Sequence, residues 1–294
     1  MRGFIAWCGI AAVLLCACSV ACAAEQHPAR GVVTRIEPAK HSMVVSCEAI
    51  PGYMSAMEME FTVRDDNVLH TITPGTTVRF TLVPRDHVLY AENVQAASAA
   101  NFEPEPMQAG GMTALEHALN PASAIAVVKQ GEAVPEFVLT DQAGRAIHLS
   151  QLRGKVVLLT FGYSRCPNPD YCVRLSNNLA LVEKRFSAHA GRELVLVTIA
   201  IDPEHDRGEA LREYAAVWHA NPADWHFLTG SLPDVQHVSA MFGMNFWRDE
   251  GLLTHSLHTA ILDRQGRLAA NLEGNQFTPQ QLGDLVQTVM DRPQ

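Results

Sequence analysis

Apolar and polar residues follow two different patterns along the chain, which predicts two structural units. Over residues 29–96, short β-prone runs alternate with turn-forming residues such as Pro38, Pro51 and Pro74. Short strands at this spacing predict a small all-β, OB-like barrel. The strands are expected at residues 31–36, 42–46, 60–63, 77–83 and 90–94.

From residue 124 to residue 292 the pattern is that of an α/β domain. Residues 156–161 form a nearly continuous apolar run, which is typical of a strand buried on both faces. Further runs at 193–201 and 258–262 alternate with segments of helical periodicity. This alternation predicts a central sheet flanked by helices. The helices are expected at residues 175–186, 209–218 and 278–290.

Two segments are expected to lie outside both units. Residues 1–24 combine a positively charged start, a long apolar run and an Ala-Cys-Ala cleavage pattern, which predicts a signal peptide and export to the periplasm. Cys16, Cys18 and Cys22 leave a membrane-anchored lipoprotein open as an alternative, tethered through a lipid anchor. Residues 97–123 contain Ala-, Pro- and Gly-rich stretches and are expected to form a linker.

Composition and charge exclude several classes of protein. Hydrophobic residues make up 48% of the 294 residues and charged residues 18%, which is typical of a globular chain rather than a fibrous or disordered one. Lys and Arg number 22 against 31 Asp and Glu, which gives a formal net charge of −9. No basic cluster accompanies this charge, so a nucleic-acid partner is not expected.

Export changes the meaning of the cysteines. The chain has 7, and four of them lie in the predicted leader, so the mature chain keeps Cys47, Cys166 and Cys172. An odd number leaves at least one thiol without an intramolecular partner, which is a liability in an oxidising compartment unless the thiol is buried or bound to a metal. These cysteines are therefore expected to have a chemical role.

Cys166 and Cys172 lie where the first buried strand ends and a helix is about to begin. A helix N-terminus favours the thiolate, and Arg165 adds positive charge. Two thiolates joined by an imidazole from elsewhere in the chain would form a soft three-coordinate set suited to Cu(I). The alternative is a structural disulfide bond, whose loop of about 7 residues would contribute only roughly 2.4 kcal/mol.

Four stretches of the second unit together resemble the SCO/SenC family. These are exported, thioredoxin-fold copper proteins associated with assembly of the copper centre of cytochrome oxidase. The resemblance covers residues 124–292. The stretches are residues 135–141, 149–159, 200–206, and Thr254-His255-Ser256 followed by residues 262–266.

The resemblance implies a thioredoxin-like fold and copper, as Cu(I) or Cu(II), bound by Cys166, Cys172 and His255. It also implies a copper chaperone, more a metallochaperone than an enzyme. Its partners would be the copper-bearing subunit of cytochrome c oxidase, a thiol reductase, or both. The family usually has three residues between the cysteines, whereas five stand here, and Val173 replaces the Pro that commonly follows.

Position separates His255 from the other histidines. It stands immediately before a predicted strand, where the thioredoxin architecture faces the cysteine loop. His258 is expected to enter that strand and is the weaker candidate. Asp202 ends a neighbouring strand, where it either supports the metal ligands from behind or serves only in a turn. The histidines interpreted as surface or packing residues are His205, His219, His226 and His237.

The barrel carries a second group of soft donors. On a strand, Met57 and Met59 point to the same face, and Met54 and Cys47 lie nearby in the sequence. Thioethers and thiolates favour Cu(I). The alternative is that the methionines fill gaps in the core.

This stretch resembles the CusF-like periplasmic copper-binding domain, over residues 29–95. The family's Pro-Ala-Met-x-Met-x-Phe signature is Ser-Ala-Met-Glu-Met-Glu-Phe at residues 55–61. Met57 and Met59 match the family's ligands, and Cys47 stands close to the place of its histidine. The resemblance implies a second copper site formed by these three residues.

Three other functions are alternatives to a copper chaperone. In a periplasmic thiol-disulfide oxidoreductase, Cys166 would attack and Cys172 would resolve. The missing Cys-x-x-Cys motif, and the absence of a Pro before the 258–262 strand, argue against it. A peroxidase would need a catalytic Thr/Cys pocket, which is not evident. A copper resistance or storage protein needs the same ligands as a chaperone, so delivery and detoxification both stay open.

Overall fold

The computed structural model describes residues 26–97, 125–249 and 252–293. The predicted leader lies outside these residues, as does all but the first residue of the predicted linker. No helix within the described ranges is long and apolar enough to cross a membrane. The domain boundaries given above stay predictions.

The first unit is a closed five-stranded barrel in the order β1-β2-β3-β5-β4, with one short helix, α1 (Asp66–Thr71). Alternate side chains of its strands fill the interior, where Phe61 packs edge-on against Phe80. Asp65 caps α1 by accepting a hydrogen bond from the Asn67 amide. The strands are β1 (His27–Glu37), β2 (Ser42–Cys47), β3 (Met57–Val63), β4 (Thr77–Arg85) and β5 (Val88–Ala96).

The second unit is built on a seven-stranded sheet in the order β14-β13-β8-β9-β10-β6-β7. The three central strands, β8, β9 and β10, are parallel, and the outer pairs are antiparallel. The strands of the sheet are β6 (Val138–Asp141), β7 (Ala146–His148), β8 (Val156–Gly162), β9 (Leu194–Ala200), β10 (Trp225–Thr229), β13 (His258–Leu262) and β14 (Leu268–Glu273).

Helices cover both faces of this sheet because its central strands are apolar on both sides. Val156 and Leu158 of β8 pack in one cluster with α3 (Arg174–Arg185), α4 (Glu209–Val217) and α6 (Pro279–Met290). Val157 and Leu159 of the same strand pack in the other cluster with α5 (Leu232–Met241). The α/β, thioredoxin-like prediction for this unit and the barrel prediction for the first are confirmed.

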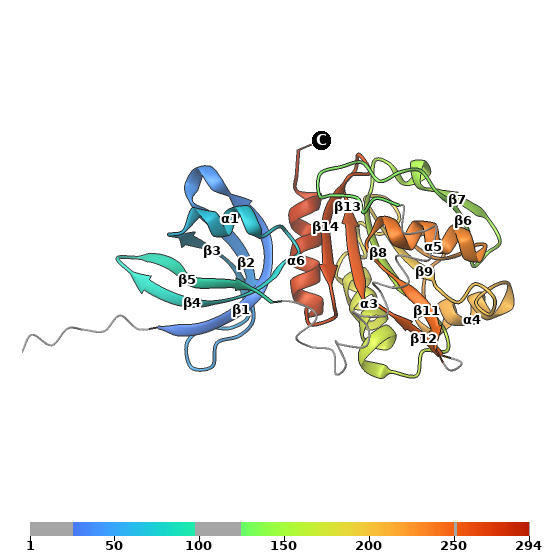
Figure 1. The fold of residues 1–294 in the computed structure, drawn as a ribbon, viewed down its shortest axis with the longest axis horizontal. Helices are drawn as coiled ribbons and strands as arrows, with labels where there is room; N and C mark the ends of the chain where they lie inside the picture. Colours follow the sequence, from blue (N-terminus) through green and yellow to red (C-terminus); the bar gives the residue numbers. More distant parts are fainter. Residues whose placement is uncertain (1–25, 98–124, 250–251, 294) are drawn as a thin grey trace, which may run out of the picture.

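One separate hairpin matters for the site. Strands β11 (Phe246–Asp249) and β12 (Leu252–His255) pair only with each other among the described residues, and His255 pairs with Phe246. In Figure 1 this hairpin lies near α4 at the end of the molecule where β8 leads into α3. It brings a segment that is remote in sequence close to the cysteine loop.

Candidate functional site

The two cysteines lie on the loop between β8 and α3. A π-helical turn, Pro169–Val173, precedes α3 and carries Cys172 on its buried side. Asn168 caps this turn by accepting a hydrogen bond from the Asp170 amide. The turn accommodates the five residues between the cysteines, so the longer loop still closes and brings Cys166 beside Cys172.

His255 completes a three-residue cluster. One donor atom from each of Cys166, Cys172 and His255 lies within 4.8 Å of the other two. The His255 Nε2 is 3.8 Å from the Cys172 Sγ, and its Nδ1 lies 2.9 Å from the Ser256 carbonyl oxygen. That carbonyl can only accept, so Nδ1 carries the proton and Nε2 is left with a free lone pair directed at the sulfur atoms.

The electrostatics of the two thiols are opposite. A hydrogen bond from Cys172 holds the pKa of the Cys166 thiol well below its usual value, and His255 adds to this effect against the opposing effect of burial. The same hydrogen bond, followed by burial, raises the pKa of Cys172. At neutral pH the pair therefore holds one thiolate and one proton.

The cause of the low pKa differs from the one expected. The sequence pointed to the helix N-terminus and to Arg165, but the guanidinium of Arg165 is bound by Asp202, with Nη2 and Oδ2 2.5 Å apart. The leading cause is the neighbouring thiol instead.

We expect iodoacetamide to alkylate Cys166 at a nearly constant rate from about pH 6 to about pH 8, because a thiol whose pKa lies well below this range is already ionised throughout it. Cys47 and Cys172 should not react in the folded protein, since both are buried. Mass spectrometry of the alkylated peptides measures the alkylation rate of each cysteine. A Cys166 rate that rises tenfold per pH unit would contradict the low pKa.

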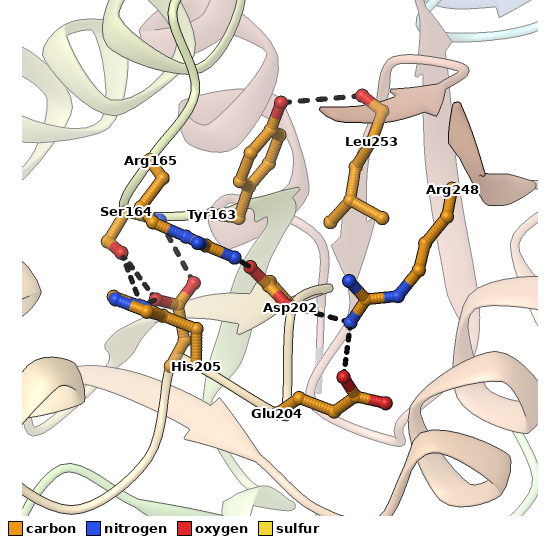
Figure 2. A network of polar contacts seen from close by, with 9 residues as sticks. Tyr163, Ser164, Arg165, Asp202, Glu204, His205, Arg248 and Leu253 are labelled. Atoms are coloured by element: carbon orange, nitrogen blue, oxygen red, sulfur yellow. Dashed lines mark hydrogen bonds and ion pairs between the residues drawn. The ribbon is translucent and has the colours of Figure 1, made fainter. Parts of the chain in front are cut away.

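A network of ion pairs connects the cysteine loop to the hairpin that carries His255 (Figure 2). Asp202 is only 2% exposed and forms an ion pair with Arg165 of the cysteine loop. Its Oδ1 lies 3.5 Å from the Nη2 of Arg248 in β11. Arg248 also binds Glu204, at 2.6 Å. Asp202 thus ties together the two segments that supply the donor atoms, and its carboxylate is neutralised by two arginines rather than directed at the sulfur atoms.

Hydrogen bonds to Asp206 and from Tyr163 also hold the segment before Cys166 in place. Asp206 accepts hydrogen bonds from the amide and the hydroxyl of Ser164, and the His205 Nδ1 lies 3.0 Å from the same carboxylate. Tyr163 donates to the Leu253 carbonyl and packs edge-on against His255. Burial, followed by the charge of Cys166, raises the pKa of Tyr163 to about 12, so its hydroxyl stays protonated.

Two other histidines, His258 and His205, lie near the site but outside the three-residue cluster. His258 lies in β13, buried and 3.3 Å from the Asn271 Oδ1, and it is not part of the three-residue cluster. His205, interpreted from the sequence as a surface or packing residue, takes part in the Ser164–Asp206 network. The sequence reasoning missed Arg248 and Asp206, because only the fold brings them to the loop.

In the barrel, the predicted soft donors lie at one end of paired strands. Cys47 of β2 is directly opposite Met57 of β3, and Met59 is opposite Val45. Met57 is 42% exposed, while Met54 and Met59 are half-buried against the barrel core. Burial, together with the charge of Glu48, raises the pKa of Cys47 to about 12. Its thiol is therefore protonated in the apo barrel and would have to lose that proton to serve as a ligand.

Comparison with known proteins gives two matches to family models. A model described as SCO1/SenC matches residues 127–291, which is more than half of the chain. A model described as the copper binding periplasmic protein CusF matches residues 26–96. The prediction of copper as the cofactor is thereby confirmed at the level of the matched families.

Individual relatives agree with these matches. A SCO2-like protein of Rickettsia typhi is 28% identical over 149 residues, covering 48% of this chain and 68% of that protein. The human mitochondrial SCO2 homologue is 31% identical over 172 residues, covering 56% of this chain and 61% of that protein. The chain thus spans about three fifths to two thirds of the length of these relatives.

Solved structures show the same fold for the second unit. A SCO1/SenC family lipoprotein from Bacillus anthracis superposes with a TM-score of 0.50 at 21% identity, over 56% of this chain and all of that one. A putative electron transfer protein from Aquifex aeolicus has the same TM-score at 17% identity, over 55% of this chain and 94% of that one. At these identities the likeness concerns the fold alone.

Proposed function

The chain belongs to the SCO1/SenC family, and from this premise we propose that it is an exported copper chaperone that binds copper through Cys166, Cys172 and His255. The observation that carries the proposal is the convergence of two sulfur atoms and one imidazole nitrogen within 4.8 Å. Such a donor set is soft and suits Cu(I), and the imidazole extends it to Cu(II).

The construction of the site favours a metal that is bound and later released. The ligands come from two segments held by Asp202, and Cys166 is half-exposed, so an incoming ligand can reach the metal from its side. We propose the copper-bearing subunit of cytochrome c oxidase as the recipient, with a thiol reductase keeping the pair reduced. The predicted leader would take the protein to the periplasm, where a lipid anchor would tether it if the leader cysteines are retained.

A barrel site formed by Met57 and Met59, with Cys47 as a third donor, is proposed as the second copper site. The match to the CusF family model and the placement of both methionines on one face of β3 support it. The buried, protonated thiol of Cys47 makes it the weaker of the three donors.

The unequal thiols also favour a second candidate function, thiol-disulfide exchange. A thiolate at Cys166 with a protonated neighbour at Cys172 is the arrangement that an attacking and a resolving cysteine require. The chaperone remains the better supported function, because exchange would use His255 only to help lower the pKa of Cys166, whereas a copper site uses the free Nε2 of His255 as a third donor.

Anaerobic titration tests the proposal. The protein with reduced cysteines should take up Cu(I) with ultraviolet Cu(I)–thiolate absorption, and the protein with a Cys166–Cys172 disulfide should show none, because thiolate is the ligand. Equal copper retention by both forms against a Cu(I) chelator would contradict the site. Normal copper binding by cysteine variants that lose disulfide reductase activity would favour the oxidoreductase. Expression under copper excess, compared with oxidase-inducing conditions, separates resistance from delivery.

A further inference from the structure

Helix α6 has no free face along most of its length, because the barrel covers the side turned away from the sheet. Leu282, Leu285 and Val286 pack in the core of the second unit, as expected for an amphipathic helix. Gln281 is nevertheless buried as well. Figure 1 shows the reason, since α6 lies between the barrel and the sheet.

The contact between the barrel and α6 combines apolar packing with buried hydrogen bonds. Val32 of β1 belongs to the same apolar cluster as α6. The Gln281 side chain donates to the Ser46 carbonyl at 3.1 Å, and the Ser46 hydroxyl donates to Asp284 at 2.7 Å. Ser46 is fully buried and Gln281 is 2% exposed. Buried polar groups that find partners across a contact make the contact specific. If the barrel docked on α6 in a different register, these groups would be buried without partners.

The first turn of α6 also lies between the two groups of soft donors. Gln280 donates at 3.2 Å to the carbonyl of Ala56, the residue directly before Met57. On the other side, the Asn275 side chain, just before α6, donates to the carbonyl of Asp170 in the π-helical turn that carries Cys172. A backbone carbonyl beside each donor group therefore contacts the start of α6, one from the barrel and one from the cysteine loop.

We propose that the barrel stays docked on α6 and passes copper to the cysteine pair within one molecule. The transfer part of this inference rests on the proposed function, whereas the docking does not. The transfer is a ligand exchange in which the bonds from Cu(I) to the Met57 and Met59 thioethers and to Cys47 break, and bonds to Cys166, Cys172 and His255 form. Copper keeps its oxidation state, Cys172 loses its proton to solvent, and Cys47 takes a proton from solvent when copper leaves it.

Docking has a kinetic consequence. A donor held on the same molecule meets its acceptor at a frequency that does not depend on the bulk concentration of protein. Transfer from the barrel to the pair is then first order, with a rate constant that does not change over about a 30-fold range of protein concentration. The direction follows from the donors, because the pair and His255 offer two thiolates and an imidazole, whereas the barrel offers two neutral thioethers and one thiol whose raised pKa makes its proton costly to displace.

The experiment separates docking from simple tethering. A protease site inserted within residues 98–124 allows the full chain to be cut after folding. The two halves should co-elute in size-exclusion chromatography after cutting. Cu(I), loaded while Cys166 and Cys172 form a disulfide, should move to the pair after reduction at the same first-order rate in cut and uncut protein. Cu(I)–thiolate absorption follows the transfer.

Ser46→Glu is the variant that tests the contact, because it places a second carboxylate against Asp284 while facing away from the barrel core. After cutting, its halves should separate and its transfer should become dependent on concentration. Thr62→Glu, at an outward-facing position near the far end of β3, is the matched control and should behave as wild type. Separation of the wild-type halves, or second-order transfer in the cut wild type, overturns the inference. Failure of the reduced pair to take up Cu(I) from solution overturns the proposed function instead.

Discussion

Serine in place of Cys166 or Cys172 is expected to lower the Cu(I) affinity of the three-residue site by more than about 100-fold. Loss of a group that merely supports a metal ligand costs about 10–100-fold, and each of these changes removes one of three donor atoms. A neutral hydroxyl is a hard donor that Cu(I) disfavours. Competition with a Cu(I) chelator measures the loss, in a background with Met57→Leu and Met59→Leu so that the barrel does not contribute.

Two histidine variants provide the comparison within this prediction. His255→Ala should weaken Cu(II) binding more than Cu(I) binding, because two thiolates can hold the reduced ion linearly whereas the oxidised ion prefers imidazole. His258→Ala is the matched control, since His258 is also buried, lies three residues later and hydrogen-bonds Asn271 outside the cluster. A larger loss in His258→Ala than in His255→Ala, or wild-type affinity in both serine variants, would show that the ligands have been misassigned.

The sequence predicted those parts of the fold that local patterns specify. The apolar run 156–161 is buried on both faces as β8, and the Thr278-Pro279 start marks the N-terminus of α6, where Thr278 forms a capping box with Gln281. The cysteines were placed correctly between a strand and a helix. These features depend on residues within a few positions of one another, so a single sequence reveals them.

Other features escaped prediction for identifiable reasons. The helix α5 was missed although Ser231 and Asp234 form a capping box at its start, because its short apolar pattern lies in an otherwise apolar region. The π-helical turn has no established sequence signal here. Arg248 and Asp202 are 46 positions apart, so their contact follows from the fold alone.

The limit of prediction from a single sequence is clearest on the surface of α6. Gln281 and Asp284 have the polar character of a solvated helix face, and nothing local distinguishes them from exposed residues. Only the position of the barrel makes Gln281 a buried donor to the Ser46 carbonyl. Contacts between units depend on the three-dimensional match of two surfaces, which periodicity along one chain does not encode.

Met57→Leu combined with Met59→Leu is expected to abolish tight Cu(I) binding by the barrel while leaving its stability nearly unchanged. Leucine and methionine have similar volumes, so the exchange costs less than about 1.5 kcal/mol even where the side chain is packed. Leucine has no sulfur, so both thioether donors disappear. The measurement uses the full chain with Cys166→Ser and Cys172→Ser, where the barrel is the remaining soft site, and combines chelator competition with thermal unfolding.

Met43→Leu is the matched control for this prediction, because Met43 lies in the same barrel but is fully buried in its core. It should leave Cu(I) affinity unchanged, since its thioether cannot reach an ion at the exposed Met57 end of the strands. Cys47→Ser tests whether the thiol contributes to Cu(I) affinity. Burial raises the pKa of Cys47 to about 12, so copper must displace a proton to bind this thiol. The loss of affinity in Cys47→Ser should therefore grow as the pH rises. If the Met57/Met59 double variant binds Cu(I) as tightly as its parent, the two methionines only fill the rim of the barrel core, and the second copper site does not exist.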